Sequence, residues 1–277
     1  MGDSIKILSD VRLPTFPKLV ERLQSLYDKG ANFADFADVV STDSALSMQI
    51  IKAANSKHFI TDNDVSDLKE AIERLGTGRL MEIVYALRFS HISPSSNISI
   101  EEYWSQTLYT AVMARKMAEH LELEKPSRMF TLGLFSNIGN LLTLVLDDEE
   151  KNQVMRISKH IKVARHSTDD FLGYSMEIAL CDICLLYWGF PKNIRYPISF
   201  QLEPQNAPTG FRLEAYVLNA AVYMRLQKYK SQVEIPEEDQ ETFARSFKKL
   251  VMDREIAHSF SASAENEVKA MLSFISV

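Results

Sequence analysis

Cysteine, glycine and proline are all scarce in this sequence of 277 residues, which contains two, nine and nine of them. Two cysteines are too few for a disulfide framework, and such sparse use is typical of a reducing compartment. The low number of glycines and prolines argues against an all-β protein, because turns between many strands use both residues. These absences favour a helical protein.

Excess positive charge and long apolar runs are also missing. The formal net charge is −6, so the chain lacks the basic character of a non-specific nucleic-acid binder, and we expect no nucleic-acid partner. No apolar run approaches the ~20 residues that span a bilayer. The first residues lack the basic and apolar regions of a signal peptide. We therefore expect a cytoplasmic protein that does not contact a membrane.

Nearly every patterned segment shows the spacing of apolar residues that is typical of a helix. Asn32 and Asp43 are suited to cap two helices in the first part of the chain, and Ser66 is expected to begin the next one. A capping box at 99–102 predicts a long helix that runs to about His120. Because no segment alternates as a strand does, the sequence predicts an all-α protein.

A change in composition divides the chain. The stretch 92–98 contains a proline and three serines, and we interpret it as the boundary of a subdomain. The chain is expected to comprise an N-terminal helical subdomain, a helical core and C-terminal helices that pack on this core: residues 1–95, 96–208 and 209–277. The apolar segments 217–226 and 271–275 could instead form the face of a dimer, although core packing is the commoner use of such segments.

The most apolar stretch of the chain, 129–146, contains a polar pair at its centre, Ser136 and Asn137. Either residue could cap a helix by accepting a hydrogen bond from a backbone N–H. Alternatively, the pair could mark an active site, where buried polar groups take part in chemistry. The helix cap is the more common use of such a pair.

Cys181 and Cys184 lie three residues apart in an apolar helical segment and share one helix face. A redox role would need a lowered thiol pKa, and a zinc site would need further Cys or His close in sequence. Neither condition is indicated, so we expect two small buried side chains.

Three blocks of sequence have a characteristic order and spacing. They are LP at 13–14, STDSAL to KAANS over 41–56, and DLKEAI to LG over 67–76. Shorter matches follow at 103–104, 133–135 and 188–191, so the likeness covers about Leu13 to Phe200. These blocks resemble the HDOD family, which is related to the HD-type metal-dependent phosphohydrolases. The resemblance implies an HD-like multi-helix bundle with an N-terminal helical subdomain.

The resemblance also implies where a metal would bind. HD enzymes hold a divalent cation through an early His, an adjacent His-Asp pair and later His or Asp ligands, and the cation activates a water for attack on a phosphate ester. In this chain the matching positions hold Gln106, Ser136, Asn137 and Met176. Neutral oxygens and a thioether are poor ligands for a hard divalent cation. We therefore expect no metal, no cofactor and no HD-type hydrolysis at this place.

One other cluster could hold a metal. His160 and His166 lie near Asp169, but their spacing of six residues does not place both imidazoles on one helix face. A solvated polar helix is the commoner meaning of this pattern. A phosphohydrolase acting through this displaced site remains the alternative function.

The leading interpretation is a non-catalytic signalling module of the bacterial-regulator type. It would bind a protein partner or a small regulatory ligand, alone or as an oligomer. The ligand-binding residues are not identified by the sequence.

Overall fold

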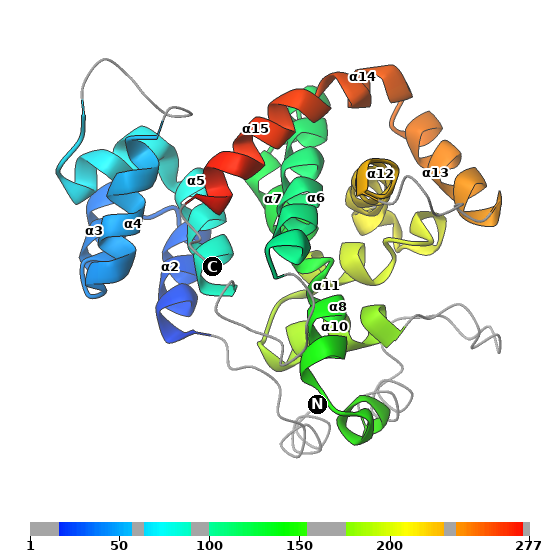
Figure 1. Ribbon diagram of the computed structural model, residues 1–277, viewed down its shortest axis with the longest axis horizontal. Helices are drawn as coiled ribbons and strands as arrows, with labels where there is room; N and C mark the ends of the chain where they lie inside the picture. Colours follow the sequence, from blue (N-terminus) through cyan, green and yellow to red (C-terminus); the bar gives the residue numbers. More distant parts are fainter. Residues whose placement is uncertain (1–16, 57–63, 90–99, 154–175, 230–236, 274–277) are drawn as a thin grey trace.

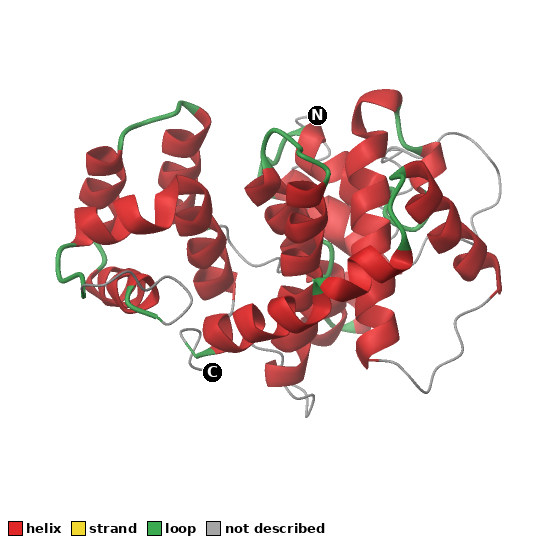
Figure 2. Cartoon of the chain, turned by 90° about the horizontal axis from the view of Figure 1, so that it is seen from above, coloured by secondary structure: helices red, strands yellow, loops and turns green. Residues whose placement is uncertain are grey.

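The structure is a computed structural model that describes residues 17–56, 64–89, 100–153, 176–229 and 237–273. Within these ranges the chain forms helices joined by short loops, and no strand occurs, as Figure 2 shows. The prediction of an all-α protein is confirmed.

The helices α2 to α5 form the N-terminal lobe, which lies in blue and cyan on the left of Figure 1. Their bounds are α2 Lys18–Asp28, α3 Phe33–Val40, α4 Ser44–Ala54 and α5 Leu68–Phe89. Two predicted caps are confirmed: Asn32 forms a capping box with Asp35, and Asp43 accepts a hydrogen bond from the Leu46 N–H at 2.9 Å. Gly76 interrupts α5 with a φ of 73°, a left-handed conformation that glycine adopts because it has no Cβ.

Asp67 caps the start of α5, so the prediction that Ser66 would do so is wrong. The Asp67 carboxylate accepts a hydrogen bond from the Glu70 N–H at 3.0 Å, and its carbonyl accepts one from Ala71. A carboxylate at this position also interacts favourably with the helix dipole, which the Ser66 hydroxyl cannot do. The capping box predicted at 99–102 begins outside the described residues.

The central bundle, as far as the structure describes it, contains five helices. They are α6 Ile100–His120, α7 Pro126–Phe135, α8 Ile138–Val145, α10 Met176–Tyr187 and α11 Lys192–Ser199. Two glycines bring these helices into backbone contact. A Cβ on Gly133 would lie 2.6 Å from the Cα of Ala111 in α6, and one on Gly139 would lie 1.7 Å from the carbonyl oxygen of Glu177 in α10. The helix pairs α6–α7 and α8–α10 therefore depend on glycine.

The C-terminal helices pack on this bundle. They are α12 Arg212–Tyr229, α13 Glu237–Lys249, α14 Arg254–Ser259 and α15 Ser261–Leu272, preceded by short 3₁₀ turns at Pro204–Asn206 and Thr209–Phe211. Residues 217–224 are buried inside the chain, so the alternative that 217–226 forms a dimer face is wrong for most of that segment. The domain boundaries at 95 and 208 stay predictions.

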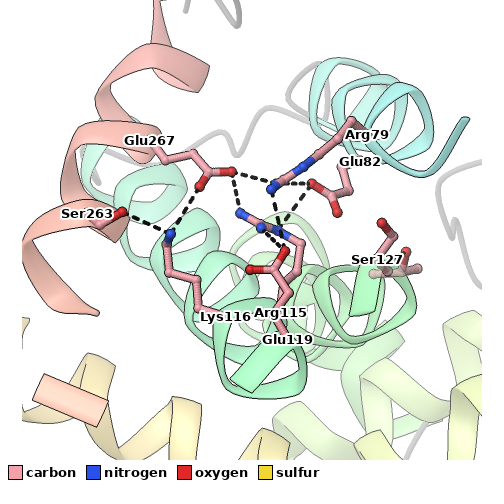
Figure 3. A network of polar contacts seen from close by, with 9 residues as sticks. Arg79, Glu82, Arg115, Lys116, Glu119, Ser127, Ser263 and Glu267 are labelled. Carbon is pink, nitrogen blue, oxygen red and sulfur yellow. Dashed lines mark hydrogen bonds and ion pairs between the residues drawn. The ribbon is translucent and has the colours of Figure 1, made fainter. Parts of the chain in front are cut away.

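An ion-pair network joins α15 to both α5 and α6 (Figure 3). Glu267 of α15 accepts hydrogen bonds from Arg79 of α5 at 2.7 Å and from Arg115 of α6. Arg79 also bonds Glu82 at 2.9 Å, and Arg115 bonds Glu119 at 2.6 Å. Because Arg115 and Glu267 are both buried, each needs the opposite charge of the other.

One hydrophobic core runs through all three parts of the chain. It extends from Val20 in α2 through Leu108 in α6 to Met271 in α15. Cys181 and Cys184 lie fully buried in this core with raised thiol pKa values, caused by burial, which confirms the prediction of two small interior side chains. No helix in the described part of the chain has the length and apolar character needed to cross a membrane.

Candidate functional site

Ser136 and Asn137 form the junction between α7 and α8. The prediction of a helix boundary at this pair is confirmed, but the predicted side-chain cap is wrong. The Ser136 hydroxyl donates to the Gly133 carbonyl at 2.7 Å, and the Asn137 side chain makes no bond to the first amides of α8. Capping usually requires an extended backbone, whereas Asn137 has φ and ψ of −103° and −1°.

The Asn137 side chain instead bonds neighbouring helices and is only 4% exposed. Its Nδ2 donates to the Thr107 hydroxyl of α6 at 2.6 Å. Its Oδ1 accepts hydrogen bonds from Asn140 of α8 and, at 2.8 Å, from Nη1 of Arg225 in α12. The Tyr103 hydroxyl of α6 donates to the Asn137 backbone carbonyl at 3.0 Å. We call these five residues the Asn137 cluster.

Arg225 carries the positive charge of the Asn137 cluster. It makes no ion pair with any carboxylate of the described residues, and its Nε is buried without a hydrogen-bond partner. Burial lowers the pKa of Arg225, and it raises the pKa of Tyr103, so the phenol stays neutral. The cluster therefore holds one guanidinium charge among neutral amides and hydroxyls.

The positions at which the family resemblance implies metal ligands carry neutral side chains in this chain. Gln106 bonds Glu102 one turn earlier at 3.2 Å, and Thr107 is the α6 residue that faces Asn137. Met176 begins α10, and its side chain is outside the described residues. The Oδ1 of Asn137 is bonded to the Arg225 guanidinium, whose charge would repel a divalent cation. The donors present do not fit a metal.

No alternative metal site is visible in the residues that the structure describes, which contain no group of three or more His, Cys, Asp or Glu suited to hold an ion. His160, His166 and Asp169 lie outside these residues, so the displaced metal site stays a prediction. The buried carboxylate of Asp182 bonds Arg195 through two contacts, at 2.9 and 3.3 Å. We interpret that pair as a structural link between α10 and α11.

A chain of hydrogen bonds leads from the junction to α13. Gln201 donates to the Ser136 carbonyl at 3.2 Å, and its own carbonyl accepts from Asn219 of α12 at 2.7 Å. Ser246 of α13 donates to the Asn219 amide oxygen at 2.6 Å. The sequence analysis missed this chain because its members are distant in sequence.

Sequence analysis also missed Arg225, Thr107 and Asn140. Asn140 follows Asn137 by three residues, a spacing that places both on one face of a helix and could have indicated their contact. Arg225 carries no such signal, because it lies 88 residues after Asn137 in a different helix.

The fold and the junction define an all-helical domain, in which an N-terminal lobe and a central bundle share one core around a buried polar cluster. Residues 13–204 match the model of the HDOD domain, and the chain belongs to the HDOD domain family. The family resemblance of the sequence is therefore confirmed. Arg225 and the helices α12 to α15 lie beyond the matched residues.

Solved structures support the fold over the whole chain. An HDOD domain protein of unknown function from Geobacter sulfurreducens has a TM-score of 0.73 at 16% identity, with 99% of this chain and 97% of that chain covered. A "Putative phosphohydrolase" from Shewanella amazonensis SB2B has a TM-score of 0.70 at 20% identity, with 99% and 98% covered. A "Putative signal transduction protein" from Marinobacter aquaeolei VT8 has a TM-score of 0.67 at 19% identity, with 100% and 65% covered.

Two curated relatives are uncharacterised proteins. One, from Treponema pallidum, is 20% identical over 72% of this chain, and the other, YuxH of Bacillus subtilis, is 28% identical over 50% of it. The matched regions make up 39% and 34% of those proteins, so the chain corresponds to well under half of their length.

Proposed function

We propose that this chain is a non-catalytic HDOD regulatory module that binds a protein partner or a small regulatory ligand. The observation that carries this proposal is the hydrogen bond from Arg225 to Asn137. At the position where the family resemblance implies a metal-binding carboxylate, the chain has a neutral amide whose oxygen is bonded to a cation. A divalent metal would have to displace this guanidinium, and the described residues contain no group of three or more His, Cys, Asp or Glu suited to hold it.

The absence of an activated group in the Asn137 cluster supports the same proposal. Its amides and hydroxyls are neutral, and burial raises the pKa of the Tyr103 phenol, so none of them is a general base at neutral pH. The nearby thiol of Cys181 is buried, donates to the Phe135 carbonyl at 3.1 Å and has a raised pKa. A thiol in this state is a poor nucleophile.

The names of the structural neighbours are compatible with more than one function. One neighbour is described as a signal transduction protein and another as a phosphohydrolase, and both share the fold of this chain. The fold therefore does not choose between these functions, and we base the choice on the residues of the cluster.

Metal content and hydrolysis together test this proposal. The purified chain is dialysed, its Fe, Mn, Mg and Zn are measured, and turnover of phosphomonoesters, nucleotides and cyclic dinucleotides is assayed with each metal. We expect substoichiometric metal and no turnover. Stoichiometric metal, with turnover that Asn137→Ala abolishes, would overturn the proposal. Turnover lost in His160→Ala or His166→Ala instead would favour the displaced metal site.

A further inference from the structure

Arg225 differs from the other arginines of the interior in what it faces. Arg115 is bonded to the carboxylates of Glu119 and Glu267, and Arg195 is bonded twice to that of Asp182. Among the described residues, the Arg225 guanidinium donates a hydrogen bond only to the neutral amide oxygen of Asn137. A guanidinium that is mostly withdrawn from water without a counter-charge is costly, so the partly exposed Arg225 favours an anion beside it.

The chain itself does not supply this anion among its described residues. The nearest acidic group of the cluster is the Tyr103 phenol, which burial keeps protonated. The oxygen of Asn137 already accepts from both Asn140 and Arg225, and a neutral oxygen does not cancel a charge. The guanidinium Nη2 donates no hydrogen bond to any described residue, and among these residues it is the donor left for a ligand.

Solvent reaches the edge of the cluster. Arg225, Ser136 and Asn140 are each partly exposed, whereas Asn137 and Thr107 behind them are buried. Asn140 uses one amide hydrogen for Asn137 and has a second one without a partner in the described structure. A ligand at this edge would thus contact the Arg225 cation and the Asn140 amide donor. Both side chains are held by hydrogen bonds to Asn137, which Thr107 in turn orients.

We propose that Arg225 and Asn140 bind a singly charged oxyanion, a carboxylate or phosphodiester group, at the edge of the Asn137 cluster. One guanidinium matches one negative charge, and hydrogen bonds between charged groups of this kind are short and strong. The proposal rests on the proposed function, because it assigns a ligand class to the regulatory module. It also reverses the charge preference of the site, from a divalent cation to an anion.

Thermal unfolding with added anions tests this site. Sodium acetate and sodium dimethyl phosphate are titrated against the chain at an ionic strength held constant with sodium chloride. We expect at least one of the two to raise the melting temperature with a saturating dependence, because a ligand that binds only the folded state stabilises it. The responsive anion shows whether the site takes a carboxylate or a phosphodiester.

Two variants of the Asn137 cluster and one control variant test whether the anion binds at this cluster. Arg225→Gln keeps an amide donor toward Asn137 but removes the charge, and we expect at least a tenfold loss of affinity. Asn140→Ala should weaken binding several-fold and serves if Arg225→Gln fails to fold. Arg245→Gln removes an exposed charge from α13 and should bind as the native chain does.

Side-chain amide signals in NMR spectra provide a second readout, since those of Asn137 and Asn140 should shift during the titration. Equal responses to acetate, dimethyl phosphate and chloride, or an unchanged affinity in both cluster variants, would overturn the anion site. That outcome would leave the proposed non-catalytic module standing. Stoichiometric bound metal with hydrolysis would instead overturn the proposed function itself.

Discussion

Asn137 shows how hydrogen bonds can determine the orientation of one buried side chain. Its amide is held by Thr107 through the nitrogen and by Asn140 and Arg225 through the oxygen. Each atom of the amide has a partner of matching polarity, so its orientation in the core is determined by hydrogen bonds. The residue is therefore a structural part of the core as well as the centre of the candidate site.

Restoring the acidic residue should not restore a metal. In Asn137→Asp, alone or with Ser136→His, the new carboxylate would pair with Arg225, and we expect less than 0.1 equivalent of Mn or Fe after dialysis, roughly a tenfold loss against a single full site. The ion pair between the new carboxylate and Arg225 should also abolish acetate binding, because the charge of the guanidinium is then neutralised. One equivalent of Mn or Fe retained after dialysis by Asn137→Asp, in a chain that keeps Arg225, would contradict this prediction.

Asp43 illustrates a charge that stabilises the fold only above a certain pH. The Leu46 N–H and the Arg88 guanidinium hold the pKa of Asp43 below its ordinary value of 3.8. Because the folded chain lowers this pKa, the stabilisation is present above about pH 4 and is lost as the pH falls through and below 3.8.

The comparison with Asp43→Asn isolates this charge, since asparagine is also a good helix cap. Urea unfolding should show the native chain to be more stable at pH 7, with a difference that shrinks steadily as the pH is lowered from about 4 to about 2. If the difference in stability between the native chain and Asp43→Asn stays constant over this range, the effect comes from the shape of the cap, and the role of the charge is contradicted.

Gly139 sets the distance between two helices. A Cβ at this position would lie 1.7 Å from the Glu177 carbonyl oxygen, and backbone cannot move aside as a flexible side chain can. Gly139→Ala should destabilise the chain by about 1–3 kcal/mol or more, because overpacking forces α8 and α10 apart. Urea unfolding measures this loss. Gly210→Ala, where no atom lies within 4 Å of the added Cβ, is the matched control and should change little.

Glu267 holds α15 to the rest of the molecule. Its side chain is 3% exposed, and its removal would leave the buried Arg115 with a weaker set of counter-charges. Glu267→Gln should cost about 3–5 kcal/mol in urea unfolding, the range for breaking a buried ion pair. Glu73→Gln removes an exposed pair with Lys69, at 45% exposure, and should cost less than about 1 kcal/mol. Similar losses in both variants would contradict the importance of burial.

The whole molecule should unfold as one unit, because a single hydrophobic core and the α5–α6–α15 ion pairs connect its parts. Trp104 and Trp188 both lie in the central bundle, so their fluorescence reports this region, whereas far-UV circular dichroism reports all helices. We expect the two signals to give coincident urea transitions. Separate midpoints would show that the N-terminal lobe unfolds independently.

Local sequence determined much of the fold. The caps at Asn32 and Asp43, the helix breaks at Gly30, Gly76 and Gly189 and the all-helical class follow from interactions within a few residues. The helix boundary at Ser136–Asn137 was likewise predictable, because a polar pair in an apolar run interrupts the periodic pattern. The cap at Ser66 was misplaced by one residue, because two neighbouring residues are both good caps.

The sequence by itself determined the helices, the family and the neutral side chains at the positions where the family resemblance implies metal ligands, because each is encoded in short stretches of chain. Only the tertiary structure decided which side chains surround these positions. It brought Arg225 from α12 to the oxygen of Asn137, and it buried the segment 217–224 that could have formed a dimer face. Contacts between residues so far apart depend on how whole helices pack, and no local pattern of residues records that packing.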